Sequence, residues 1–271
     1  MFGRGDTKYP VPLTLKKLKE IDSHLFAERN TNIENLISLD FDFDLLNQDA
    51  DFAYNNHPLD VIPFALTAFA GEHFGFLTDF GTVIDLENAS IVHVEAMPAG
   101  EFHVTLIAIN LKEFLGLLLA NRDWISYIYE QNIEEDKSSD SNPDFSYFSK
   151  LLNDQIDIWP LILDNYRENL IEIRSKRIVV STLNGIGITR ISSDNLGPNL
   201  IIDSNKDYEY IYDDVKNYLK NASIENKLAC IVDLQELGVL ASIGELNEYL
   251  INELKNMGFF YESKMLGLTN K

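Results

Sequence analysis

The histidines and the carboxylates near them are the side chains of this chain best suited to chemistry. His93 and His103 flank Pro98, and a hairpin that turned there would set the two imidazoles roughly opposite each other, with Glu95 and Glu101 close by. Such a group could hold a metal ion, or it could be a polar cross-strand pair on a solvated face. Because no CxxC or HExxH pattern supports a metal site, we expect neither a metal ion nor another cofactor.

The best acid–base group in the sequence consists of Glu72, His73 and Asp79. An even number of positions separates His73 from Asp79, which places both on one face of a strand. Polar residues at strand ends more often fix a turn or present a binding surface than catalyse a reaction. With no nucleophile elbow, Walker lysine or Ser-His-Asp order, the sequence displays no reaction. An enzyme, such as a metal-dependent hydrolase using His and Asp residues on the central strands, remains the alternative, since triads are defined by geometry.

Two further patterns resemble ligand loops only in part. Gly185-x-Gly187 lacks the third glycine and the following lysine of a phosphate loop. Aspartates alternate with apolar residues over 40–51, but the glycine and the terminal glutamate of a calcium loop are missing. We therefore expect a turn at Gly185-x-Gly187 and an exposed acidic face at residues 40–51.

The elements that must position the central residues are two hairpins and a helix. Asn110 followed by Glu113 marks a helix start of the capping-box type, and Phe114 belongs to the apolar face that should cover the sheet. The strands are expected at residues 61–70 and 73–81 for the first hairpin, and at 90–96 and 102–109 for the second.

The flanking sequence predicts mainly helices. An amphipathic helix is expected at 14–28, whereas 33–39 fits either a strand or a short helix. Asn184-Gly185 suits a type I′ turn between two short strands. Helical spacing is found at residues 145–173, 207–220, 224–237 and 242–257.

These elements predict an α+β chain in three parts. Residues 1–130 should form a module of sheet and helices, and residues 145–271 a mostly helical region with a short hairpin. Between them, residues 131–144 are polar, acidic and serine-rich, the composition of a linker or an exposed loop.

Charge limits the classes of partner. The chain has 22 basic and 43 acidic residues, a net charge of -21, which repels nucleic acids and anionic membranes and attracts cationic proteins. Acidity could also serve solubility alone. The single cysteine, Cys230, lies in an apolar helical run and should be buried. The N-terminus lacks the apolar segment of a signal peptide, so we expect a cytoplasmic protein.

One family resemblance covers the central elements. Residues 71–81, with the Asp79-Phe80-Gly81 end of a glycine-rich strand pair, 91–94 and 106–115, with the Asn110-Leu-Lys-Glu-Phe-Leu helix, are similar to the core of the SUKH superfamily. The similarity extends over residues 60–118. That superfamily includes bacterial immunity proteins against secreted polymorphic toxins and fungal regulators of cell-wall synthesis.

The resemblance implies a SUKH-like sheet packed by helices, and a protein that binds and does not catalyse. Together with the charge, it predicts a bacterial immunity protein that neutralises a basic toxin domain by stoichiometric binding. Loops at strand ends are exposed and held by a rigid sheet, so the expected contact residues are Glu72, His73, Asp79, Asp85 and Glu87.

Overall fold

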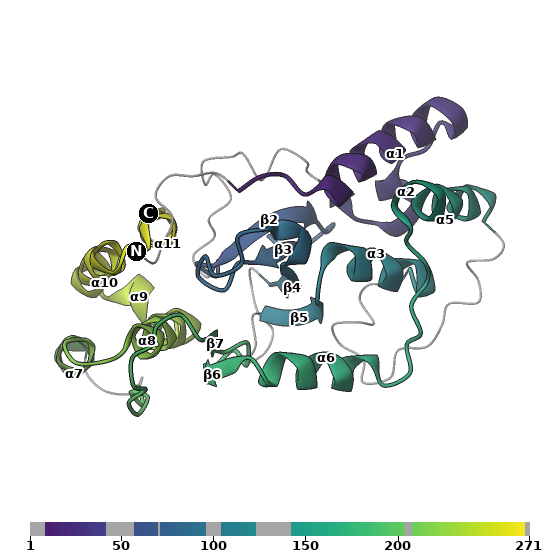
Figure 1. Cartoon of the computed structure of the whole chain (residues 1–271). Helices are drawn as coiled ribbons and strands as arrows, with labels where there is room; N and C mark the ends of the chain where they lie inside the picture. The colour runs from purple at the N-terminus through teal and green to yellow at the C-terminus, as the bar shows by residue number, and fades with distance from the viewer. Residues whose placement is uncertain are drawn as a thin grey trace.

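The fold is α+β, as the sequence predicts. The computed structural model describes residues 9–41, 57–69, 71–95, 104–122, 142–203 and 208–268. Within these residues, helices pack over a five-stranded sheet whose strands follow chain order, each antiparallel to its neighbour (Figure 1). Its strands are β1 (Asp40–Phe41), β2 (Val61–Leu66), β3 (His73–Leu77), β4 (Ser90–Val94) and β5 (Val104–Ala108).

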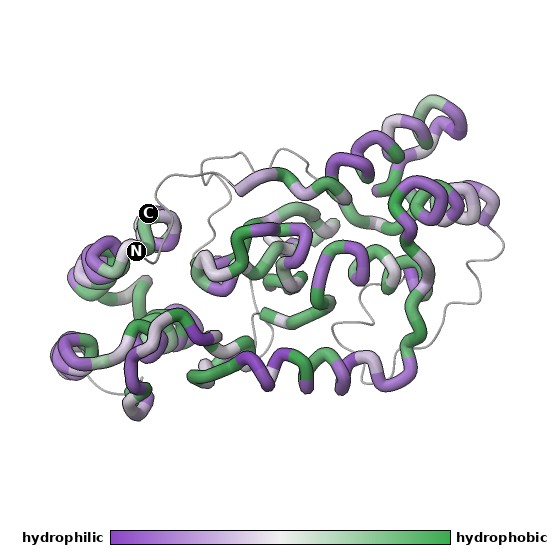
Figure 2. Tube along the Cα trace, viewed as in Figure 1, coloured by the Kyte–Doolittle hydropathy of each residue, from purple (hydrophilic) through white to green (hydrophobic). Residues whose placement is uncertain are grey.

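The sheet is buried on both faces. Along β3, Phe74 and Phe76 belong to the larger hydrophobic cluster on one face, whereas Leu77 packs on the other face with Val92 and Val94 of β4. Figure 2 shows these strands as mainly hydrophobic segments at the centre of the molecule. A sheet covered on two sides needs near-continuous apolar strands, which this chain supplies.

The second hairpin has a different register from the one expected. His93 pairs with Thr105, so the predicted pairing of His93 with His103 is wrong. Burial of the apolar positions on both faces fixes the register, because a slip along the strand would move those side chains relative to their partners. His103 itself lies outside the described residues, as do Glu101 and residues 42–51 of the aspartate-rich stretch.

One face of the sheet is covered by the N-terminal helices and two later ones. These are α1 (Leu13–Arg29), α2 (Ile33–Ile37), α3 (Leu111–Ala120) and α5 (Pro143–Ile156). Residues 33–37 therefore form a helix. At the start of α3 the Asn110 side chain accepts from the Glu113 N–H, at 2.9 Å, and the Glu113 carboxylate accepts from the Ile109 N–H, at 3.0 Å. The predicted capping box is confirmed.

An aromatic group joins α3 to the sheet. The ring centroid of Phe114 lies 4.9 Å from that of Phe74 and 5.8 Å from that of Phe64, and the Phe64 and Phe76 rings are 4.4 Å apart. All four side chains are buried. Edge and tilted contacts of this kind add to the burial of apolar area.

The later part of the chain is mostly helical, as predicted. Helix α6 (Tyr166–Ser175) lies along β5 and is followed by a small antiparallel pair, β6 (Ile178–Val180) and β7 (Ile188–Thr189). The remaining helices are α7 (Tyr208–Leu219), α8 (Ile224–Glu236), α9 (Val239–Ser242), α10 (Gly244–Met257) and α11 (Phe260–Leu268). Cys230 is buried within α8, and burial raises the pKa of its thiol to about 12.

The hairpin between β6 and β7 is longer than a type I′ turn. The Gly185 N–H donates to the Thr182 carbonyl, and Gly185 and Gly187 have positive φ while Asn184 does not. A type I′ turn requires positive φ at both central residues, so that prediction is wrong. Ile178 packs 2.6 Å from where a Cβ on Gly187 would lie, which explains the second glycine.

The two largest hydrophobic clusters of the described chain do not meet at the predicted linker, residues 131–144. The larger extends from Tyr9 to Leu163 and includes α5, which packs on α1. The second runs from Val180 to Leu266 and also takes in Leu59 and Phe80 from the ends of β2 and β3. Residues 131–141 of the predicted linker lie outside the described residues. Helix α5, which begins at Pro143, belongs to the larger cluster.

No helix in the described ranges has the length and apolarity needed to cross a membrane.

Phe114→Ala should lower the free energy of unfolding by about 3 kcal/mol, because the truncation leaves a cavity against the rings of Phe64 and Phe74. The matched control is Phe26→Ala on α1, since Phe26 is 64% exposed, and it should change stability by less than about 0.5 kcal/mol. Urea unfolding of both variants measures this difference. Equal losses would place the Phe114 ring outside the core.

Candidate functional site

The residues predicted to contact a partner do not form one exposed surface. Asp85 is exposed, Glu72 and Glu87 are half-buried, and His73 and Asp79 are buried. The expectation that His73 and Asp79 are exposed is therefore corrected: strand β3 and its end lie between two packed layers. A partner that docks on this fold meets Asp85 and parts of Glu72 and Glu87.

Asp85 and Glu87 lie in the connection between β3 and β4, which contains a short 3-10 helix, η2 (Leu86–Asn88). The Asp85 carboxylate accepts from the Glu87 N–H, at 3.1 Å, and from the Asn88 side-chain amide, at 2.9 Å. The Glu87 carboxylate accepts from the backbone N–H of Thr14, at 3.1 Å, and from its hydroxyl. These bonds hold two carboxylates in fixed positions beside the sheet.

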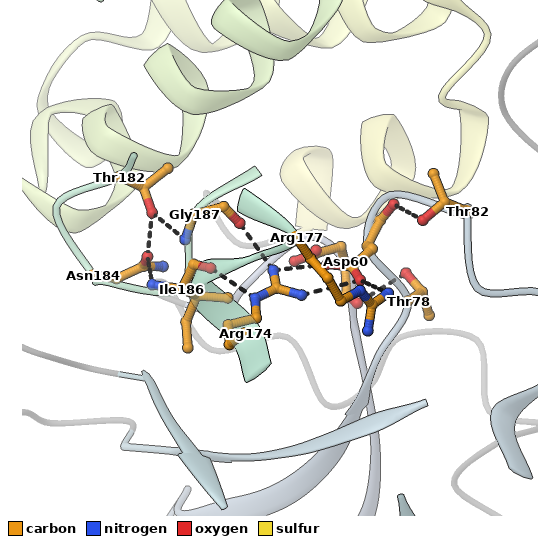
Figure 3. A network of polar contacts seen from close by, with 10 residues as sticks. Asp60, Thr78, Thr82, Arg174, Arg177, Thr182, Asn184, Ile186 and Gly187 are labelled. Carbon is orange, nitrogen blue, oxygen red and sulfur yellow. Dashed lines mark hydrogen bonds and ion pairs between the residues drawn. The ribbon is translucent and has the colours of Figure 1, made fainter. Parts of the chain in front are cut away.

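Asp79 anchors a buried ion-pair network (Figure 3). Its carboxylate lies 2.8 Å from the Arg174 guanidinium and 3.2 Å from that of Arg177. Arg174 also donates to the carbonyls of Ile186, at 2.9 Å, and Gly187, at 3.0 Å. Arg174 is 5% exposed and Arg177 46%. The network ties the end of β3 to α6 and to the β6–β7 loop.

The backbone at Asp79 adopts a conformation that its residue types disfavour. Asp79 and Phe80 have φ of 48° and 52°, and Gly81 continues the left-handed run at 77°. Two such residues cost on the order of 1 kcal/mol each. The turn directs the Phe80 ring into the second cluster, where its centroid lies 6.0 Å from that of Phe259. Ion pairs at Asp79 and burial of Phe80 offset this cost.

Two further carboxyl groups are buried near the same junction. Burial and, to a lesser extent, the neighbouring charge of Asp79 together raise the pKa of Asp60 to about 7, while Arg174 acts in the opposite direction. Burial likewise raises the pKa of Glu262, on α11, to about 7. Perturbed carboxyls often mark functional sites, but here they lie inside the protein between packed elements, with the ion pair beside them.

The central histidines lie on different faces of the sheet. The rings of Phe74 and His93 are 5.1 Å apart on one face. Since side chains alternate along β3, His73 lies on the other face, where its ring stacks on His57 at a centroid distance of 5.1 Å. The alternative in which His and Asp residues of the central strands form one catalytic site requires His73 and His93 to lie together, and the fold places them on opposite faces of the sheet.

These imidazoles are neutral near pH 7. Burial lowers the pKa of His57 to about 3, that of His73 to about 4 and that of His93 to about 3. His93 lies 3.6 Å from the Glu72 carboxylate. In the portions of the chain described, no group of three or more His, Cys, Asp or Glu side chains has the geometry to hold a metal ion.

A pocket of about 260 Å³ opens between the β4–β5 side of the sheet and α6. Asn88, Ser90 and Asn110 supply polar groups to its wall. The larger side chains that line it are Leu106, Ile109, Leu170, Ile173, Arg174 and Arg177. It is thus a pocket of mixed polar and apolar lining that includes two arginines, beside the turn that carries Asp85 and Glu87.

The arginines of this site were not predicted from the sequence. A weak signal exists: Arg174, Lys176 and Arg177 form a basic group at the end of a helical stretch in a strongly acidic chain. Such a group is ordinarily a solvated helix end, and only the fold brings it to Asp79, which lies 95 positions from Arg174 in the chain.

Comparisons with models of protein families and with curated proteins found no match to this chain.

Arg174→Ala should lower the free energy of unfolding by about 3 kcal/mol or more, because it removes the main partner of a buried carboxylate and leaves two carbonyls without their donor. Arg177→Ala should cost less than about 1 kcal/mol, since its guanidinium is half exposed. Guanidinium unfolding of the two variants tests this. Similar losses would mean that both arginines support the fold equally.

Glu262→Gln should gain stability relative to the parent chain as pH rises. The folded Glu262 carboxyl has a pKa of about 7, above its ordinary value of 4.5, so folding stability falls as pH rises from 4.5 through 7. The glutamine cannot ionise, and its relative gain between about pH 5 and pH 8 should be on the order of 2 kcal/mol.

Urea midpoints at the two pH values measure the Glu262→Gln effect. Glu245→Gln, an exposed change on α10, is the control and should show no such pH dependence. A relative stability that is the same at both pH values would contradict the raised pKa of Glu262.

Proposed function

We propose that this chain acts by stoichiometric binding to a basic protein, as an immunity protein that neutralises a toxin domain. The observation that carries the proposal is the rigid acidic turn at Asp85 and Glu87. Both carboxylates are fixed by hydrogen bonds, one to η2 and one to the start of α1, on a chain with a net charge of -21. A pre-ordered charged surface loses little conformational freedom when a partner docks.

Apolar side chains near the turn add to this support. Leu13, next to Thr14, is 64% exposed, and Ile84, next to Asp85, is 56% exposed. Exposed apolar residues bordered by carboxylates are the composition of a protein-binding surface, in which apolar contacts give affinity and charges give orientation and encounter rate.

The resemblance to the SUKH superfamily supports the same function. The residues that carry it form β3, β4, β5 and α3, the elements that hold the turn between β3 and β4 in place. A bacterial origin and a toxin partner are implied by that resemblance, and the expected cytoplasmic location rests on the N-terminal sequence; all three are part of the proposal. His73 and His93 are neutral and lie on opposite faces of the sheet, so they give no comparable support to the hydrolase alternative.

The test uses the double variant Asp85→Asn, Glu87→Gln, which removes two charges and leaves one oxygen acceptor in each side chain, where each carboxylate uses two. The partner to test is a toxic C-terminal domain of a large secreted protein, if the neighbouring gene encodes one. Association should slow roughly threefold or more, with dissociation and thermal stability little changed, because long-range attraction acts on encounter.

The matched control is Asp213→Asn, Glu248→Gln, an equal charge change at exposed positions of α7 and α10. Association rates are measured at about 50 mM and about 300 mM salt, where screening lengths differ more than twofold. No complex at micromolar concentration would remove the proposal. Equal slowing by both double variants would assign the effect to net charge and not to the turn.

A further inference from the structure

The pocket between the sheet and α6 has two arginines in its wall, Arg174 and Arg177, and both guanidiniums lie on the Asp79 carboxylate. Among the described residues the other acid that acts on Arg174 is Asp60, whose pKa of about 7 leaves it partly protonated at neutral pH. None of the residues lining the pocket is acidic. In a chain of net charge -21, guanidinium groups are therefore concentrated in the wall of a defined cavity.

The two arginines have different roles there. Arg174 is buried and directs its donors to Asp79 and to the carbonyls of Ile186 and Gly187. Arg177 is 46% exposed, and within the described chain its side chain makes a single hydrogen bond, from one terminal nitrogen to Asp79. A guanidinium has five N–H donors in a planar fork, so Arg177 can bind a second oxyanion while it retains Asp79.

The remainder of the pocket wall selects the form of that anion. Leu106, Ile109, Leu170 and Ile173 line the cavity with aliphatic side chains, and Ser90 adds a hydroxyl. The volume of about 260 Å³ equals that of roughly nine liquid waters, at about 30 Å³ each. That space fits a small aliphatic body with one charged group.

We propose that this pocket binds a monocarboxylate carried on a small aliphatic group, with the carboxylate on Arg177 and the aliphatic group against Ile173 and Leu106. The half-exposed guanidinium of Arg177 can bind a single carboxylate, and the negative field of the whole chain opposes a phosphate dianion. The carboxylate belongs either to a free acid or to the C-terminal residue of a peptide. Carboxylate binding in this pocket does not involve the acidic turn at Asp85 and Glu87, so the two proposals can be tested separately.

The probes are isocaproate for the free acid and N-acetyl-leucine for a chain terminus, each compared with its neutral amide. Ligand-observed NMR titration of the full chain measures affinity, which should be on the order of a millimolar for ligands of this size. Both acids should bind more tightly than their amides. Binding of isocaproate alone assigns the pocket to free acids, and binding of N-acetyl-leucine extends it to chain ends.

Two pairs of variants locate the site. Arg177→Gln should weaken binding roughly tenfold, whereas Lys176→Gln, an equal charge change at the neighbouring exposed residue, should not. Ile173→Glu adds a carboxylate to the wall and should abolish binding, whereas Ile171→Glu, on the same helix and outside the pocket lining, should not. Since all four side chains are at least partly exposed, the folded state should persist, which melting temperatures verify.

Binding that the amides match, or that Arg177→Gln leaves intact, would overturn the proposal. The proposal would also be overturned if neither acid bound saturably at about ten times the expected dissociation constant.

Discussion

The buried contact between Asp79 and Arg174 is the interaction on which the arrangement of this protein depends. It joins the end of β3 to α6 and the β6–β7 loop, and so connects the sheet to the helical region that follows. Because a buried charge without its partner is strongly unfavourable, the pair fixes which surfaces meet. The left-handed turn at Asp79 and Phe80 is retained for the same reason: it presents the carboxylate to one arginine and the Phe80 ring to the second core.

Burial of the sheet on both faces has consequences for its polar residues. In an antiparallel sheet with one face in water, His73 or His93 would be exposed and would titrate near neutral pH. Here helices α1, α3 and α5 cover one face, and α6 with the β6–β7 loop covers the other. Both imidazoles are therefore held neutral, and polar side chains that suggested chemistry in the sequence contribute instead to the interior.

The functional surfaces that remain lie at the margins of this interior. The connection between β3 and β4 carries fixed carboxylates on one side and contributes Asn88 to the arginine-lined pocket on the other. An acidic surface and a small pocket with arginines in its wall thus lie close together, each held by bonds that the fold already makes. Such pre-ordering suits recognition, because the groups need not be immobilised when a ligand or a partner arrives.

The sequence by itself determined the local elements. Short apolar runs bounded by turn residues specified β2 to β5, and Asn110 with Glu113 specified the start of α3, because both signals depend on residues a few positions apart. It also determined the α+β class, the net charge and the burial of Cys230. Only the tertiary structure decided that Asp79 is buried, that His73 and His93 lie apart, and that α5 belongs to the first core. Those outcomes depend on contacts between residues such as Asp79 and Arg174, 95 positions apart, and composition or periodicity carries no information on which distant segments meet.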